Sequence, residues 1–249
     1  MKLKGRVINV ECIEFKINNE ISAAEYISDQ HSEIIVLSHG LGGNGGTIYS
    51  YYEYFDKQNK GVLSFDYPCH GYRNDNYKNY TVDNCLNTLN EVYKYLIKKY
   101  PNKKISFLGT SLGSLYLYKY ILDNKPKIEK VLFKCMPLEN SKNMTKMFLN
   151  DENKDKDYFT VFPGLDLPKT LLNELKTLEY GLKEIDYLSK EKILFIHGTA
   201  DKLANFEKTK DFCEKFNYNL KVVYGGDHNF KENNSKSVLM DTINEFLGE

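Results

Sequence analysis

Short apolar runs of strand length alternate with amphipathic helical segments along most of this 249-residue chain. Such an alternation predicts an α/β fold, with a mostly parallel sheet and helices on both of its faces. The predicted strands are an opening hairpin at about 5–17 and 22–28, then Ile34–Ser38, Gly61–Phe65, Lys104–Leu108, Val131–Phe133, Lys192–Ile196 and Leu220–Val223. The length suits a single domain, residues 1–249, that buries a sizeable core.

The helical segments lie between these strands. Apolar residues at about Val82–Tyr100 recur every three or four positions, which is typical of a helix that packs one face on a core. Further helices are expected to begin at or just after Ser111, and to span about Phe206–Phe216 and about Ser235–Phe246.

The alternation breaks at about residues 138–190, where the sequence contains no convincing strand. Asp151–Asp157 is highly charged and loop-like, prolines punctuate the stretch that follows, and a helix is expected to begin near Thr170. This region is therefore predicted to be a cap inserted over the sheet.

Composition excludes several classes of function. Lys plus Arg and Asp plus Glu each number 34, so the chain lacks the basic excess of a nucleic-acid binder. No run approaches the ~20 apolar residues of a membrane span, and no continuous apolar segment of a signal peptide follows the first residues. Five widely spaced cysteines without a C-x-x-C pair predict reduced thiols. We expect a cytoplasmic protein, and whether it forms a homodimer stays open.

The most specific motif is the pentapeptide Gly109-Thr110-Ser111-Leu112-Gly113. It follows a predicted strand and precedes a helical pattern, the context in which G-x-S-x-G places a serine hydroxyl above a sheet on a sharp turn. The two glycines allow neighbouring backbone to approach closely, because they carry no side chain. Ser111 is therefore the predicted nucleophile.

A serine hydroxyl needs a base to take its proton, and the base needs a carboxylate to orient it. His228 follows the last predicted strand in a glycine-rich loop and is the predicted base. Asp201 follows the Lys192–Ile196 strand and is the predicted carboxylate. Its alternative role is to cap the helix that begins near Asn205. The order Ser111, Asp201, His228 is typical of one class of serine hydrolases.

The remaining histidines carry no predicted catalytic role. His31 precedes a strand, whereas His39, His70 and His197 are expected to shape loops at strand ends. Asp227 adjoins the predicted base in sequence and is expected either to support the site from behind the triad or to face solvent, because adjacent side chains rarely meet productively.

An acyl-transfer site also needs two backbone N–H groups that bind the developing oxyanion. The predicted donors are Leu112, at the start of the helix after the nucleophile, and Leu41, in the glycine-rich stretch His39–Asn44. A phosphate-binding loop is the alternative for that stretch, but it matches neither G-x-x-x-x-G-K-[ST] nor G-x-G-x-x-G.

Over almost its whole length the chain resembles the α/β-hydrolase superfamily. The matching residues are His39-Gly40, Asp66-Tyr67-Pro68-Cys69-His70-Gly71, Gly109–Gly113, His197-Gly198 with Asp201, and His228. The D-x-P-x-H-G turn is typical of the lipase, esterase and aminopeptidase-like branch, and H-G-x-x-G-N is similar to feruloyl and cinnamoyl esterases and to monoacylglycerol lipases. The resemblance implies an eight-stranded, mostly parallel sheet, a variable cap after the sixth strand, and no metal or organic cofactor.

The expected activity is hydrolysis of an uncharged, small-to-medium carboxylic ester through an acyl-enzyme. Apolar cap residues either line an acyl pocket or pack the cap onto the sheet; they are Met144, Met147, Phe148, Tyr158, Phe159, Phe162 and Leu165. A thioesterase or an aminopeptidase-like amidase with the same triad is the first alternative. A non-catalytic, hydrolase-like binding protein is the second.

Overall fold

The computed structural model describes residues 13–232 and 234–248. The first half of the predicted opening hairpin, residues 5–12, lies outside this part of the chain. Eight strands form one sheet in the order β1-β2-β4-β3-β5-β6-β9-β10. They are β1 (Ile13–Ile17), β2 (Ile21–Tyr26), β3 (Glu33–Ser38), β4 (Lys60–Phe65), β5 (Lys104–Thr110), β6 (Val131–Lys134), β9 (Ile193–Gly198) and β10 (Asn219–Val223).

The sheet is mostly parallel, which confirms the predicted fold class. β1 pairs with β2 and β2 with β4 in antiparallel fashion, and the remaining pairs from β4 to β10 are parallel. Because parallel strands end at the same edge, the loops after β3, β5, β9 and β10 lie at one edge of the sheet. Every predicted site residue follows one of these four strands in the sequence and so lies near this edge.

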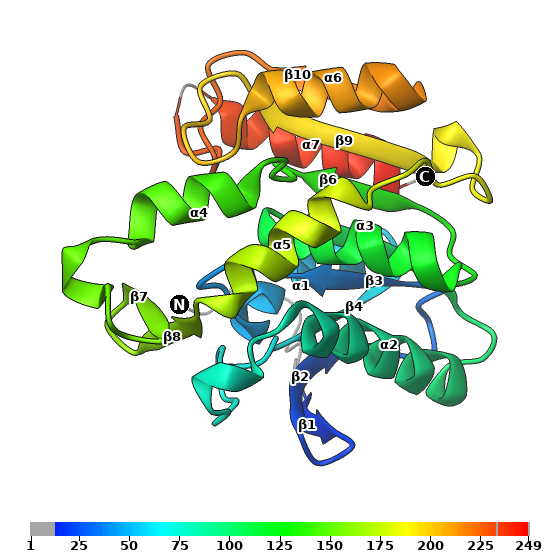
Figure 1. Ribbon diagram of the computed structural model, residues 1–249. Helices are drawn as coiled ribbons and strands as arrows, with labels where there is room; N and C mark the ends of the chain where they lie inside the picture. Colours follow the sequence, from blue (N-terminus) through cyan, green and yellow to red (C-terminus); the bar gives the residue numbers. More distant parts are fainter. Residues whose placement is uncertain (1–12, 233, 249) are drawn as a thin grey trace.

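Helices cover both faces of the sheet (Figure 1). On one face lie α2 (Val82–Lys99), α3 (Leu112–Asn124) and α6 (Phe206–Phe216); on the other lie α1 (Tyr52–Asp56) and α7 (Ser235–Leu247). Short 3₁₀ helices occur at Gly45–Ser50 (η1), Tyr77–Asn79 (η2), Asp151–Asn153 (η3) and Lys190–Lys192 (η4). No helix in residues 13–232 and 234–248 is long and apolar enough to cross a membrane.

The continuous apolar run of β3 reflects burial on both faces of the sheet. All six residues of β3 are buried. Ile34 and Val36 pack into the cluster beneath α2 and α3, whereas Ile35 and Leu37 pack into the cluster beneath α1 and α7. Successive side chains of a strand point to opposite faces, so a strand covered on both sides is apolar at every position.

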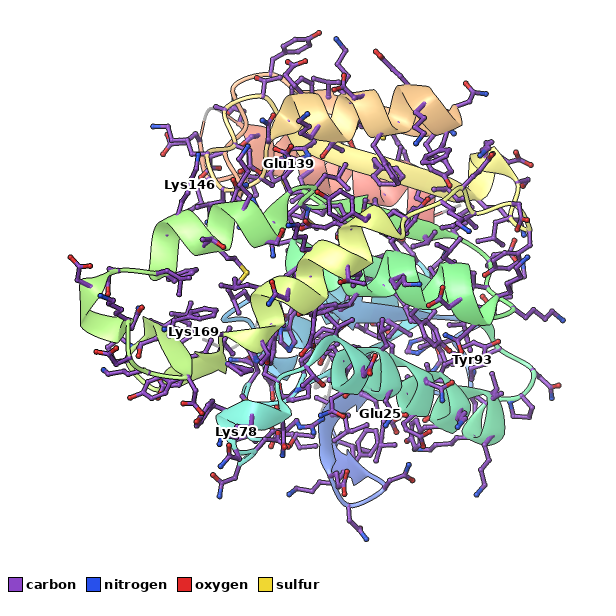
Figure 2. The ribbon with its side chains drawn as sticks, viewed as in Figure 1. Glu25, Lys78, Tyr93, Glu139, Lys146 and Lys169 are labelled. Carbon is purple, nitrogen blue, oxygen red and sulfur yellow. The ribbon has the colours of Figure 1, made fainter. Side chains whose placement is uncertain are left out.

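A buried carboxylate helps to fasten α2 to the sheet. Glu25 on β2 is 3% exposed, and it accepts hydrogen bonds from the hydroxyls of Tyr95 and Tyr100 and from Lys99 Nζ at 2.6 Å. Figure 2 labels Glu25 beneath this helix. A buried charge is tolerated when several donors share it, as they do here.

The chain leaves the sheet after β6 and returns at β9, and we call residues 135–192 the β6–β9 segment. It contains α4 (Asn140–Phe148), β7 (Tyr158–Phe162), β8 (Leu165–Pro168) and α5 (Thr170–Tyr180). The helix predicted near Thr170 is present, whereas the absence of strands predicted here is wrong. β7 and β8 pair antiparallel in a separate two-stranded sheet.

The β7–β8 hairpin has no clear sequence pattern, because its strands are short and irregular. Gly164 in the connecting turn has φ +94°, a conformation that glycine adopts at low cost, and a register shift occurs between Thr160 and Phe162. Pro168 ends β8. Lys169, which Figure 2 labels in this segment, donates from Nζ to the carbonyls of Asn153 and Lys154 and so links the end of β8 to the stretch before β7.

Candidate active site

Ser111 lies on a sharp turn between β5 and α3. Its backbone has φ +52° and ψ −126°, and its N–H donates to the carbonyl of Lys134 at 2.8 Å. A non-glycine residue in this region costs about 1–3 kcal/mol, so the surrounding structure must hold it there. The turn directs the hydroxyl above the end of the sheet, as the motif predicts.

Close backbone contacts explain the motif's glycines. A Cβ on Gly113 would lie 2.2 Å from the carbonyl oxygen of His39, and a Cβ on Gly109 would lie 2.8 Å from Cα of Ser114. Neither neighbour is a flexible side chain. Gly40 is similarly close on the facing loop, where a Cβ would lie 3.0 Å from Cβ of Ser111. Glycine at these positions allows β3, β5 and α3 to approach around Ser111.

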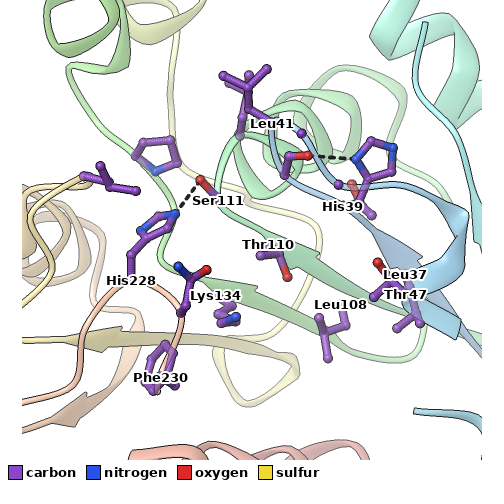
Figure 3. Close-up of a pocket in the computed structure, with 18 of the residues that line it drawn as sticks. Leu37, His39, Leu41, Thr47, Leu108, Thr110, Ser111, Lys134, His228 and Phe230 are labelled. Atoms are coloured by element: carbon purple, nitrogen blue, oxygen red, sulfur yellow. Dashed lines mark hydrogen bonds between the residues drawn. The ribbon is translucent and has the colours of Figure 1, made fainter. Parts of the chain in front are cut away.

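The structure brings Ser111, Asp201 and His228 together. His228 Nε2 lies 2.9 Å from Ser111 Oγ, the contact drawn in Figure 3, and His228 Nδ1 lies 2.7 Å from Asp201 Oδ2. The three side chains come from the loops after β5, β9 and β10. Residues up to 117 positions apart in sequence therefore form one hydrogen-bonded chain.

Asp201 is fully enclosed and accepts four hydrogen bonds. Its Oδ1 accepts from the N–H groups of Leu203 and Ala204, and its Oδ2 faces His228 and His197. Burial raises the pKa of Asp201, but the hydrogen bonds from His197, His228 and Ala204 outweigh burial and lower its pKa overall. The carboxylate is therefore ionised.

The charge of Asp201 determines the tautomer of His228. An ionised carboxylate only accepts hydrogen bonds, so Nδ1 of His228 carries the proton and donates it. Nε2 of the neutral ring is then an acceptor, and the hydroxyl of Ser111 donates to it. This direction of hydrogen bonding is the one a serine nucleophile needs.

Direct contacts join the loops that carry Asp201 and His228. A Cβ on Gly198 would lie 2.1 Å from the carbonyl oxygen of Gly226, so the glycines allow the two loops to touch. Ala200 N–H donates to that same carbonyl at 3.0 Å. The alternative capping role of Asp201 does not apply to α6, because Asn205 caps that helix by accepting from Glu207 N–H.

Leu41 and Leu112 both line the cavity that contains Ser111. Leu112 is the first residue of α3, and Leu41 lies in the loop after β3. Neither N–H donates a hydrogen bond to any residue within 13–232 or 234–248. The helix dipole adds positive potential at Leu112. Both amides are available to an oxyanion.

His39 and His70 shape the loop that carries Leu41. His39 Nε2 accepts from Tyr67 N–H at 3.1 Å, and His70 Nε2 accepts from Gly42 N–H at 3.0 Å. Burial, with a smaller contribution from the nearby charge of His70, lowers the pKa of His39 to about 3. Burial also lowers the pKa of His70. Both rings are thus neutral acceptors, in keeping with the loop-shaping role expected from the sequence.

His197 has a closer relation to the site than the sequence indicates. It is completely buried, and its Nε2 lies 3.1 Å from Asp201 Oδ2. Because the carboxylate is ionised, Nε2 must carry the proton. Nδ1 is then a bare acceptor with no hydrogen-bond partner in the part of the chain that the structure describes. Its position four residues before Asp201, at the end of β9, is the signal that could have indicated this contact.

Cys135, His197 and Asp201 have donor atoms within 4.8 Å of one another, a spacing that a metal ion could bridge. A metal needs cysteine as a thiolate. Burial, followed by the charge of Asp201, raises the pKa of the Cys135 thiol, which opposes that form. Asp201 Oδ2 is moreover already bonded to two histidines. The cluster fits support of the Asp201 carboxylate better than metal binding.

A cavity of about 820 Å³ opens around Ser111 and His228. One side is formed by the β6–β9 segment, and the other by η1, α7 and the ends of β3 and β5. Of the apolar residues singled out in the sequence, Met144, Met147, Phe148 and Phe162 line the cavity, whereas Phe159 and Leu165 are buried in the core. Both expected roles therefore occur, lining and packing.

The charged side chains that line this cavity all carry the same sign. Lys134, Lys231 and Lys236 contribute to its walls, and no aspartate or glutamate does so among the described lining residues. The chain as a whole has no net charge. The positive character of the cavity is therefore local.

Comparison with known proteins agrees with this arrangement. Residues 29–150 match the family described as serine aminopeptidase, S33. No curated protein matches the chain by sequence. Among solved structures, the chain is similar to Est1E from Butyrivibrio proteoclasticus with bound ferulic acid, at a TM-score of 0.74 and 16% identity, covering 94% of this chain and 97% of that one.

Two further solved structures have the same architecture. A monoacylglycerol lipase from Paleococcus ferrophilus has a TM-score of 0.68 and 18% identity, covering 92% of this chain and 98% of that one. Alpha/beta hydrolase domain-containing protein 10 from mouse has a TM-score of 0.70 and 15% identity, covering 94% and 97%. The sheet order and these structural matches show that the chain has the α/β-hydrolase fold.

Proposed function

We propose that this protein is a serine hydrolase that cleaves a small-to-medium carboxylic ester through an acyl-enzyme intermediate. The observation that carries the proposal is the hydrogen-bonded chain from Ser111 Oγ through His228 to Asp201, with distances of 2.9 and 2.7 Å. A nucleophile, a base and an orienting carboxylate in contact are the minimum that nucleophilic acyl transfer needs.

In the proposed reaction Ser111 Oγ attacks the ester carbonyl carbon while His228 Nε2 takes the hydroxyl proton. The carbonyl oxygen becomes an oxyanion and accepts hydrogen bonds from the amides of Leu41 and Leu112. The tetrahedral intermediate then collapses, and His228 returns the proton to the departing alcohol. Water, activated by the same imidazole, attacks the acyl-enzyme and releases the carboxylic acid and the serine.

Asp201 acts on this reaction through His228. The imidazole becomes positively charged when it takes the serine proton, and an ionised carboxylate 2.7 Å from Nδ1 stabilises that charge. Because hydrogen bonds lower the pKa of Asp201, the carboxylate keeps its charge throughout. We infer that Asp201 thereby also holds the ring in the tautomer that can accept the proton.

We infer that residues 138–190 form a cap that shapes the substrate site. Supporting this, α4 and β7 contribute Met144, Met147, Phe148 and Phe162 to the cavity around Ser111. Phe162 also contacts the loop after β3, because a Cβ on Gly42 would lie 2.8 Å from its ring. Apolar walls of this kind favour an acyl or aryl group of modest size.

An aminopeptidase-like amidase is the second candidate, and the description of the matching family favours it. An aminopeptidase must hold the ammonium group of its substrate, which requires a carboxylate or comparable acceptors near the nucleophile. The described cavity lining contains three lysines and no acidic residue. This charge opposes a cationic substrate, so the ester activity is the better supported. A thioesterase would use the same residues.

Labelling with a fluorophosphonate, followed by a substrate panel, tests the proposal. The wild type should react at Ser111 and hydrolyse short esters, while Ser111→Ala should do neither. A panel of matched esters, thioesters and amides ranks the alternatives. Full ester turnover by Ser111→Ala would contradict the proposed nucleophile, and an unlabelled wild type would favour a non-catalytic binding protein.

A further inference from the structure

Lys134 combines a buried side chain with a position beside the nucleophile. It is the last residue of β6, it is 8% exposed, and it lines the cavity that contains Ser111. Its carbonyl accepts from Ser111 N–H at 2.8 Å and from the hydroxyl of Ser114 at 3.1 Å. The backbone of Lys134 therefore helps to hold the turn at Ser111, and its side chain starts next to that turn.

The side chain of Lys134 points to the α7 side of the sheet. Leu132, two residues earlier on the same strand, belongs to the cluster beneath α1 and α7, and alternate residues share a face. Lys134 Nζ lies 5.4 Å from the ring centroid of Phe230, which belongs to the same cluster. In Figure 3, Lys134 lies between the Ser111–His228 pair and Phe230.

The ammonium group of Lys134 has no anionic partner. It forms no ion pair and no hydrogen bond with any side chain or carbonyl in residues 13–232 and 234–248. Lys60, which is equally buried, is paired with Glu33 at 2.8 Å and also donates to the carbonyl of Leu247. Burial lowers the pKa of Lys134, and the nearby Cys135, Asp227 and Asp201 offset this only in part.

An unpaired buried cation costs free energy, and a bound anion that pairs with it would offset that cost. No described residue that lines the cavity is acidic, so an anionic partner for Lys134 in this cavity would have to be a bound ligand. Phe230 lies beside Lys134, and Leu108 and Leu239 are further buried apolar residues that line the same cavity. Of the three lysines that line the cavity, only Lys134 is buried, because Lys231 and Lys236 are exposed, so its ammonium is suited to pair with one negative charge.

We propose that Lys134 binds an ionised carboxylate of the substrate, so that the preferred substrates are esters that also carry one free carboxylate, such as monoesters of dicarboxylic acids. The inference rests on the proposed ester hydrolysis at Ser111 and specifies its substrate class, which differs from the uncharged ester that the sequence predicts. The carboxylate pairs with the Lys134 ammonium in the α7-side arm of the cavity, while the scissile carbonyl lies at Ser111. Hydrolysis itself proceeds as described above, and Lys134 takes no part in proton transfer.

The test compares charged and uncharged substrates of the same shape. Monoethyl esters of dicarboxylic acids from succinate to suberate are each paired with the analogue whose free carboxylate is replaced by a carboxamide. Released ethanol is measured for both. For the best chain length, kcat/KM should favour the carboxylate by about 10- to 100-fold, the worth of one hydrogen-bonded charge. Equal rates, or a preference for the amide, in the wild type would overturn the proposal without any variant.

Two lysine variants separate Lys134 from general surface charge. Lys134→Met keeps a long side chain and should abolish the carboxylate preference, so that kcat/KM for each carboxylate ester becomes similar to that for its carboxamide partner. Lys221→Met removes one charge from an exposed position on β10, outside the cavity, and should leave the preference intact. A preference that survives in Lys134→Met, or disappears in Lys221→Met, contradicts the assignment to Lys134.

The outcomes also distinguish this inference from the proposed function. If the wild type is labelled by fluorophosphonate and hydrolyses carboxamide esters but shows no carboxylate preference, only the Lys134 inference fails. If it is neither labelled nor active on any ester, the proposed function fails first. A Lys134→Met protein that is labelled at the wild-type rate has a folded site, so its loss of preference is then attributable to the missing ammonium.

Discussion

His197 Nε2 lies 3.1 Å from Asp201 Oδ2, so the carboxylate that faces His228 is also held by a second, completely buried histidine. Both rings must donate to it, because Asp201 is ionised. The second donor restrains the carboxylate independently of His228. It also stabilises the negative charge, because hydrogen bonds to the charged form lower a carboxyl pKa.

Removing this second donor should weaken catalysis without abolishing it. His197→Phe keeps a ring of similar size but loses the N–H, so Asp201 retains three of its four hydrogen bonds. We expect kcat for ester hydrolysis to fall by about 10-fold, the worth of one hydrogen bond to a charge. Steady-state kinetics measure this, with circular dichroism as the check on folding. An unchanged kcat would mean that His197 only fills space.

Asp201→Asn should have a larger effect than His197→Phe. An amide can donate to Nδ1 of His228, which stabilises the tautomer that cannot accept the serine proton. We expect kcat to fall by about 10³- to 10⁴-fold, with fluorophosphonate labelling slowed in parallel. Stopped-flow labelling and ester kinetics provide the two measurements. Activity within tenfold of the wild type would contradict the assigned role.

The stability of the protein should depend on pH through Asp201. Its folded pKa is lowered, so it stabilises the native state at pH values above its unfolded pKa of about 3.9, and that contribution is lost as the pH falls toward the folded pKa. The free energy of unfolding of wild type minus that of Asp201→Asn should therefore shrink as the pH falls below about 4. Urea unfolding between neutral and acidic pH measures it, and a difference that grows on acidification would contradict the sign.

Gly113→Ala should destabilise the fold. Its Cβ would lie 2.2 Å from the carbonyl oxygen of His39, which cannot move without disturbing the loop of Leu41. We expect a loss of about 2–4 kcal/mol in the free energy of unfolding. Gly181→Ala is the matched control, because its φ is −82° and its Cβ would lie 3.4 Å from the nearest atom, so it should change stability by less than about 1 kcal/mol. Similar losses in both variants would contradict the role of close packing.

Phe162→Ala should change substrate selection more than chemistry. Phe162 lines the cavity and is 45% exposed, so its loss removes apolar wall without opening the core. We expect KM for medium-chain esters to rise about fivefold, the worth of roughly 1 kcal/mol of apolar contact, while kcat changes little. A chain-length series of ethyl esters measures this. A fall in kcat with KM unchanged would argue that the residue positions the catalytic groups instead.

Much of the fold follows from local sequence patterns. Buried parallel strands such as β3 are continuous apolar runs, and α6 spans Phe206–Phe216, the range expected from the sequence. The grouping of Ser111, Asp201 and His228 follows from topology, because each residue stands after a strand of a sheet whose parallel strands end at one edge. The hydrogen-bond distances among these three residues come from the structure alone, because the order of residues in the chain does not specify them.

Other features depend on contacts that no local pattern records. The β7–β8 hairpin has strands of five and four residues and pairs only with itself, so its alternation is too short to read. The contact of His197 with Asp201 depends on the path of the turn after β9. The isolation of Lys134 is a property of all the residues that surround it, since a lysine in a sequence is exposed and solvated by default.

The position at which the chain departs from the sheet has a further consequence. β6 and β9 are directly paired neighbours, from Val131 against Ile193 to Lys134 against Ile196. The 58 residues between these strands thus begin and end on neighbouring strands of the sheet. Their length and content can change without altering any strand register, and a longer loop adds little closure entropy. The stretch can therefore accept insertions and deletions while the pairing of β6 with β9 stays the same.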